Sequence, residues 1–188
     1  MTLAWNRSMI ALCALALGAP LAGARAENPA TPPTDAEIAA IVVAANQVDI
    51  DAGKLAAGKA QSADVRTLAQ RMVTDHTGVN QQASALVQKL GVTPKSNTTS
   101  EGLAKGGEDN LKKLRGLSGP AFDQAYVSNE ITYHQAVIDA LDQTLIPNAS
   151  NAELRALLVK VRPAFVSHLE HAKHLQSKLG GGGTGATK

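Results

Sequence analysis

Hydrophobic residues recur every three or four positions along four long stretches of the chain, a spacing that predicts amphipathic helices. We expect these helices over residues 35–60, 63–90, 119–146 and 151–179. The stretches are rich in Ala, Leu, Val, Gln and Lys, which favours helix. No alternating pattern typical of strands competes with them. The chain is therefore predicted to be all-α.

Residues suited to helix ends bound these stretches. The expected boundary residues are Asp35 for the first helix, Ser62 and Gly91 for the second, Ser118 and Pro147 for the third, and Ser150 or Asn151 and Gly180 for the fourth. Short links join the first helix to the second and the third to the fourth, so each pair is expected to form an antiparallel hairpin.

The link between the two hairpins is long, at residues 91–118, and a structureless loop of that length is unusual. Its middle, residues 101–117, is predicted to be a short helix, weakened by Gly106 and Gly107. Two helical hairpins joined by a long crossover are the ferritin-like form of the four-helix bundle. We predict this fold for residues 35–179.

Four polar residues interrupt the hydrophobic stripes, one in each predicted helix: Asp49, His76, His134 and His168. Each lies near the middle of its helix. Helices packed side by side with matched ends bring their midpoints to one level, whichever way each runs. These four side chains are therefore expected to meet inside the bundle.

Neighbouring residues extend this cluster. Glu130 lies one turn before His134, and His171 lies one turn after His168, at spacings that place each pair on one helix face. Asp75, beside His76 along the chain, is expected to orient a ring on another helix. His174 is expected to be an exposed cation in the last turns of its helix.

Histidines and carboxylates on facing helices predict a metal site, for iron, copper, manganese or zinc. The candidate ligands are His76, His134, His168, Glu130, Asp49 and His171. The alternative is a hydrogen-bonded polar layer that fixes helix register, with neutral imidazoles satisfied by Asp or Glu. The chain contains no Glu-x-x-His, so a complete di-iron centre is not indicated.

The two ends of the chain differ from its middle. Residues 1–26 have the features of a secretory signal: Arg7, an apolar run at residues 9–17, and a small-x-small cleavage site at residues 24–26. Residues 27–34 form a Pro-rich spacer and residues 180–188 a Gly-rich tail, and both are expected to be disordered. No other segment is apolar enough to span a bilayer. The mature chain is therefore expected in the periplasm or secreted.

Removal of the signal changes the composition. The full chain has 18 Lys and Arg against 16 Asp and Glu, and loss of Arg7 and Arg25 leaves 16 basic residues and formal neutrality. This balance argues against general nucleic-acid binding, which needs a basic face. Cys13 and Trp5 also lie in the signal, so thiol catalysis, disulfides and iron–sulfur clusters are excluded.

Several motifs resemble the domain of unknown function 4142 family. They are Asp49–Ala56, Val65–His76 with its Met-Val-x-Asp-His ending, Gly119-x-x-Phe-Asp-x-x-Tyr126, and Arg162-Pro163 followed by His168. The resemblance covers residues 35–179. It implies an exported bacterial helical bundle of ferritin-like form and supplies no established activity. The family usually carries Glu at the position of Asp49.

Two functions remain open from the sequence. The first is a non-catalytic binding or structural protein of the cell envelope or stress physiology. The second is a metal-binding or redox protein that uses the histidine and carboxylate cluster. The sequence does not distinguish a monomer from a homodimer, and it contains no Gly-x-Ser-x-Gly elbow or phosphate-binding loop that indicates an enzyme.

Overall fold

The structure is a computed structural model that describes residues 31–181. The predicted signal at residues 1–26 lies outside the described residues, as do residues 182–188 of the predicted tail. The elements are α1 (Asp35–Lys59), α2 (Ala63–Leu90), α3 (Thr98–Arg115), α4 (Gly119–Ala140), a π-helical turn (Leu141–Leu145), α5 (Ile146–Asn148) and α6 (Ala152–Gly181). Residues 31–181 contain no strand, so the predicted all-α class is confirmed.

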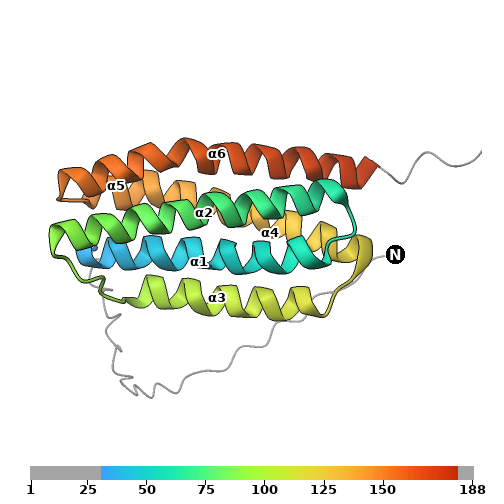
Figure 1. Cartoon of the computed structure of the whole chain (residues 1–188), viewed down its shortest axis with the longest axis horizontal. Coiled ribbons are helices and arrows are strands. Elements are labelled where there is room, and N and C mark those ends of the chain that lie inside the picture. Colours follow the sequence, from blue (N-terminus) through green and yellow to red (C-terminus); the bar gives the residue numbers. More distant parts are fainter. Residues whose placement is uncertain (1–30, 182–188) are drawn as a thin grey trace, which may run out of the picture. The chain divides into compact units, whose positions relative to one another are not determined.

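The two predicted hairpins are present: α1 packs along α2, and α4 packs along α6 (Figure 1). The bundle has an apolar cluster toward each end. One contains Ile38 of α1 and Leu154 of α6; the other contains Val65 of α2 and Phe122 of α4. α1 and α6 therefore run from the first cluster to the second, while α2 and α4 run back. This is the predicted ferritin-like four-helix bundle with a long crossover.

The crossover helix α3 is a fifth packing element, beside α1 and outside the four-helix bundle (Figure 1). The expected helix is present and begins earlier than predicted, at Thr98, because Asn97 caps it with a reciprocal pair of hydrogen bonds to Ser100. Gly107 has a packing role: a Cβ there would lie 2.7 Å from Val48 Cγ2 on α1. Glycine at this position lets the two helices approach closely.

Most helix ends agree with the sequence prediction. Ser62 caps α2, and Gly91 ends it in the left-handed conformation at φ +63°. The expectation that Asp35 caps α1 is wrong, because Thr34 does so in a capping box with Glu37. The Asp35 carboxylate instead accepts hydrogen bonds from the backbone N–H groups of Ser150 and Asn151. It thereby ties the start of α1 to the start of α6.

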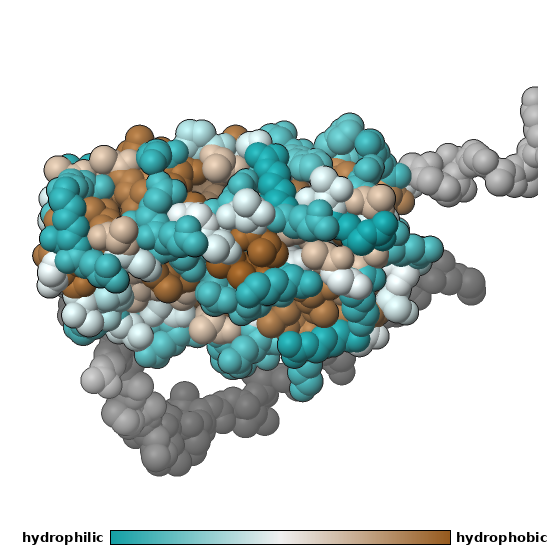
Figure 2. All heavy atoms as spheres, viewed as in Figure 1, coloured by the Kyte–Doolittle hydropathy of each residue, from teal (hydrophilic) through white to brown (hydrophobic). Residues whose placement is uncertain are grey.

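Hydrophilic residues cover much of the face shown in Figure 2, with hydrophobic residues visible between them. Among the described residues, Val159 is the only large hydrophobic side chain classed as exposed. A search of the described helices finds none with the length and apolar character needed to cross a membrane.

Candidate metal centre

Three histidines from three helices meet between the two apolar clusters. His76 of α2, His134 of α4 and His168 of α6 are each 1–2% exposed. Their ring centroids form a nearly equilateral triangle with separations of 5.5, 5.2 and 5.3 Å. Each ring offers one nitrogen, and these three nitrogens lie within 4.8 Å of one another. The expectation that mid-helix positions share one level therefore holds for all three.

Each of the three rings has one nitrogen hydrogen-bonded to an oxygen. His76 Nδ1 donates to Asn46 Oδ1 at 2.7 Å, and His134 Nδ1 donates to the Glu130 carbonyl at 3.0 Å. His168 Nε2 donates to Asp75 Oδ2 at 2.8 Å. Because amide, carbonyl and carboxylate oxygens accept hydrogen bonds, the proton of each neutral ring is assigned to the bonded nitrogen. The second nitrogen then carries a free lone pair.

That second nitrogen has no hydrogen-bond partner in any of the three rings. His76 Nε2, His134 Nε2 and His168 Nδ1 are all buried and unpaired. A histidine that ligates a metal usually donates its other N–H to an oxygen in this way, which fixes the tautomer and orients the ring. The three histidines thus combine oriented rings with available lone pairs.

Two carboxyl groups complete the polar layer. Asp49 of α1 is 2% exposed and Glu130 of α4 is 1% exposed. Asp49, Glu130 and His134 each offer one possible ligand atom, and these three atoms lie within 4.8 Å of one another. Asp49 Oδ2 is 3.4 Å from His76 Nε2, and Glu130 Oε2 is 3.4 Å from His134 Nδ1. Asp49 Oδ1 has no hydrogen-bond partner, and neither Glu130 oxygen makes a hydrogen bond of standard geometry, although the nearby Tyr126 hydroxyl partly offsets the effect of burial on the Glu130 pKa.

Burial dominates the protonation of the layer. It raises the pKa of the Asp49 carboxyl well above its usual value, with a further increase from Glu130, and it raises the pKa of Glu130 to about 8. It lowers the pKa of His76 strongly and that of His134 to about 4, because a buried imidazolium is disfavoured. Without a bound cation, the layer therefore favours neutral side chains.

An aromatic ring closes one side of the histidine triangle. Phe165 of α6 stacks on His76 with an interplanar angle of 6° and a centroid distance of 5.2 Å, and it lies 6.3 Å from His134. Phe165 is itself buried. The ring packs against His76 and contributes to the burial of the layer.

His171 is not brought into the cluster. It is partly exposed, and it belongs to neither group of candidate ligands found among the described residues. Burial, followed by repulsion from Arg71, lowers its pKa. His174 is exposed, as expected.

The sequence interpretation missed Asn46, which is buried and holds His76. Its own Nδ2 donates to the Val42 carbonyl at 2.8 Å, which directs Oδ1 toward the ring. A polar residue three positions before Asp49 was the available signal. The expected orienting role of Asp75 is confirmed, since this half-buried residue of α2 bonds His168 of α6 across the helix interface.

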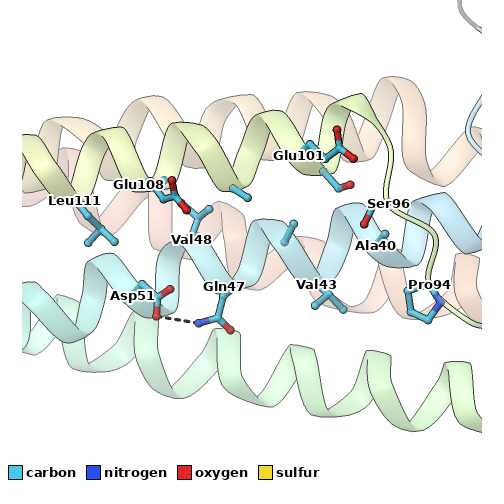
Figure 3. Close-up of a pocket in the computed structure, with 14 residues that line it drawn as sticks. Ala40, Val43, Gln47, Val48, Asp51, Pro94, Ser96, Glu101, Glu108 and Leu111 are labelled. Atoms are coloured by element: carbon cyan, nitrogen blue, oxygen red, sulfur yellow. Dashed lines mark hydrogen bonds between the residues drawn. The ribbon is translucent and has the colours of Figure 1, made fainter.

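A wider hollow of the described residues lies away from the histidines. It is an open groove of about 550 Å³ between α1 and α3 (Figure 3). Glu101 and Glu108 line it and are exposed, and Asp51 accepts a hydrogen bond from Gln47. These carboxylates are solvated and contact none of the histidines. The buried layer, and not the groove, therefore carries the candidate chemistry.

Comparison with known proteins identifies the family. The family described as Domain of unknown function (DUF4142) matches residues 20–175, and the chain belongs to it. A search of curated proteins finds no match. A solved structure titled "CopM in the Cu(II)-bound form" resembles this fold with a TM-score of 0.63 and 16% identity, covering 79% of this chain and 99% of that one. At that identity, the likeness supports the helical-bundle fold.

Proposed function

We propose that this member of the domain of unknown function 4142 family binds a divalent transition-metal ion in the core of its bundle. The ligands are His76, His134 and His168, with Asp49 and Glu130 as the carboxylates beside them. The proposal is one of binding, and it assigns no reaction. His171, though expected among the ligands, is not part of the proposed site.

The observation that carries the proposal is the set of unpaired atoms. A purely structural polar layer requires the histidines and carboxyls to satisfy one another, because a buried polar atom without a partner costs about 1–3 kcal/mol. All five residues instead retain at least one buried atom with no partner. The bonded nitrogens are directed to Asn46, Asp75 and a backbone carbonyl. A ligated ion explains both the unpaired atoms, which would bind it, and the hydrogen-bonded nitrogens, which orient the rings.

The geometry fits an ion with a small adjustment. Three atoms no more than 4.8 Å apart lie within about 2.8 Å of a common point, against roughly 2.0–2.1 Å for a metal–imidazole bond. Modest side-chain rotation closes that difference. Charge also fits, because two ionised carboxylates neutralise a divalent cation among neutral imidazoles, and a buried ion needs such compensation.

The donor set narrows the choice of ion. Imidazole suits copper, zinc, iron and nickel, while sites for magnesium and calcium are built from oxygen. Copper(II) binds nitrogen and oxygen ligands most strongly among the divalent first-row ions. The Cu(II) form of the structurally similar protein also supports copper as the first ion to test.

The test measures how much metal the purified mature chain contains and how tightly it binds each ion. The chain is stripped with a chelator and titrated with Cu(II), Zn(II), Fe(II) and Mn(II) chlorides by equilibrium dialysis. We expect one tightly held ion per chain. Replacing any one of His76, His134 or His168 by Gln is expected to weaken it by roughly ten-fold or more, since an imidazole ligand is lost.

The matched control is His174→Gln, the same substitution at an exposed position of α6. It is expected to leave the tight site unchanged. Circular dichroism and thermal unfolding of each metal-free variant establish that the bundle is intact. Equal metal affinity of the starting protein and the His76/His134/His168 triple variant, both folded, would contradict the proposal.

We also propose that the chain acts outside the inner membrane after cleavage beyond Ala26. The signal-like residues 1–26 support this. Mass spectrometry of the protein from a periplasmic fraction is expected to find Glu27 as the first residue. Recovery of chains that retain residues 1–26 in the cytoplasm would contradict it.

A further inference from the structure

A second hollow lies inside the bundle and leads to the polar layer. It has a volume of about 190 Å³ and lies between α1 and α4, with α3 contributing Thr99 and Leu103. At its polar end it reaches Asn46, Asp49 and His76. The metal proposal uses Asp49 and His76 at this end and assigns no role to the rest of the space.

The walls of this hollow are almost entirely apolar. They include the buried side chains of Ile41, Leu141, Leu158, Val161 and Phe165. An apolar cavity of ~150 Å³ in another protein stays dry and takes up benzene, because water finds too few hydrogen-bond partners there. A space of this size and lining matches one six-membered ring.

The polar end of the hollow offers a directional contact. Asp49 is 2% exposed, and its Oδ1 atom has no hydrogen-bond partner. Because Asp49 lies at the polar end of a mostly apolar space, one polar group on an occupant gains a hydrogen bond there that is stronger than the same bond in water. This favours a ring that carries a single hydroxyl over a plain hydrocarbon.

An entry route lies beside α3. Tyr133, Thr99 and Leu103 line the inner hollow and also a shallower surface groove between α3 and α4. Tyr133 is partly buried, and its hydroxyl donates to the Ala45 carbonyl on α1 at 3.0 Å. Leu103 and Tyr133 thus line both spaces, and we expect rotation of these side chains to admit a small molecule.

We propose that the cavity between α1 and α4 is a binding pocket for a small uncharged aromatic molecule with one hydroxyl group, held by its apolar walls and by Asp49. This pocket does not depend on the metal proposal. The ring fills the apolar space, and the hydroxyl bonds to the Asp49 carboxyl. A charged occupant is excluded, because the walls cannot solvate it.

The probes are phenol, toluene and benzoate, added to metal-free protein and followed by calorimetry and ligand-observed NMR. Phenol is expected to saturate one site per chain. Toluene, of nearly the same size, is expected to bind several-fold more weakly, and benzoate at least ten-fold more weakly. Asp49→Ala is expected to reduce phenol binding to the level of toluene.

Two variants with the same substitution locate the site. Val161→Phe places a ring in the cavity and is expected to abolish phenol binding, whereas Val159→Phe, at an exposed position on the same helix, is expected to leave it intact. If Val161→Phe does not fold, Ala140→Leu fills the same space from α4. Absence of saturable binding by phenol and toluene, or equal binding by the filled-cavity variant and Val159→Phe, overturns the proposal.

The metal titration separates this pocket from the ion site. Val161→Phe leaves all five proposed ligands in place and is expected to retain the ion. His134→Gln, which leaves every residue that lines the cavity in place, is expected to weaken ion binding while the cavity still binds toluene. Either proposal can therefore fail alone.

Discussion

Asp49 of α1 and His76 of α2 lie side by side in the core, with Asp49 Oδ2 3.4 Å from His76 Nε2 and both residues 2% exposed. The pair does not satisfy itself, because Asp49 Oδ1 and His76 Nε2 both lack a hydrogen-bond partner. His76 is held from its other side by Asn46. This arrangement leaves one buried atom of each residue available to the ion that we propose.

The orienting role of Asn46 can be tested without removing a ligand. Asn46→Ala removes the oxygen that accepts the His76 Nδ1 hydrogen, so the ring loses its fixed tautomer and direction. We expect metal affinity to fall roughly 10–100-fold, the usual effect of losing such a partner. Equilibrium dialysis with Cu(II) and Zn(II) measures it. Gln47→Ala, at the exposed neighbouring position, should bind as the starting protein does; an equal loss in both variants would contradict the assignment.

Glu130 distinguishes a binding site from a structural layer. Both of its side-chain oxygens are buried without a hydrogen bond of standard geometry, so Glu130→Met fills similar volume without the cost of burying them. We expect the free energy of unfolding of the metal-free protein to rise by about 1–3 kcal/mol, measured by urea denaturation. Metal affinity should fall in the same variant. A structural polar layer predicts the opposite sign for stability, since its members hold one another.

Gly107 sets how closely α3 approaches α1. Gly107→Ala introduces a Cβ 2.7 Å from Val48 Cγ2, so the helices must separate, and we expect a loss of about 1–3 kcal/mol in unfolding free energy. Gly106→Ala is the matched control, because a Cβ there meets nothing within 4 Å. It should stabilise the helix by about 0.5–1 kcal/mol, since alanine is the better helix former. Changes of the same sign at both positions would argue against close packing at Gly107.

Asp123 holds the turn between α1 and α2 from the start of α4. Its carboxylate accepts hydrogen bonds from the backbone N–H groups of Gln61 at 3.0 Å and Ser62 at 2.7 Å, and the residue is 2% exposed. Asp123→Ala leaves both donors without that acceptor, and we expect a loss of about 2–4 kcal/mol. Thermal and urea unfolding measure it. Asp109→Ala, which removes only an exposed ion pair with Lys105, should change stability little.

Hydrophobic spacing and capping residues were enough to predict the helical hairpins and the crossover. They also placed His76, His134 and His168 at one height, because a residue's position along a helix sets its level in a bundle. The same reasoning placed Asp49 and Glu130 in the layer. The same reasoning also predicted His171 as a ligand. Its ring, one turn after His168, instead lies at the partly exposed edge of α6.

The sequence by itself determined which segments are helical, which faces they bury and at what height the polar residues lie, since these follow from local propensity and a fixed helical period. Only the tertiary structure decided which nitrogen of each histidine is free, that Asn46 holds His76, that α3 packs on α1 through Gly107, and that a cavity opens between α1 and α4. These features depend on the rotation and separation of neighbouring helices. Those quantities are set jointly by side chains far apart in the chain, and no single segment encodes them.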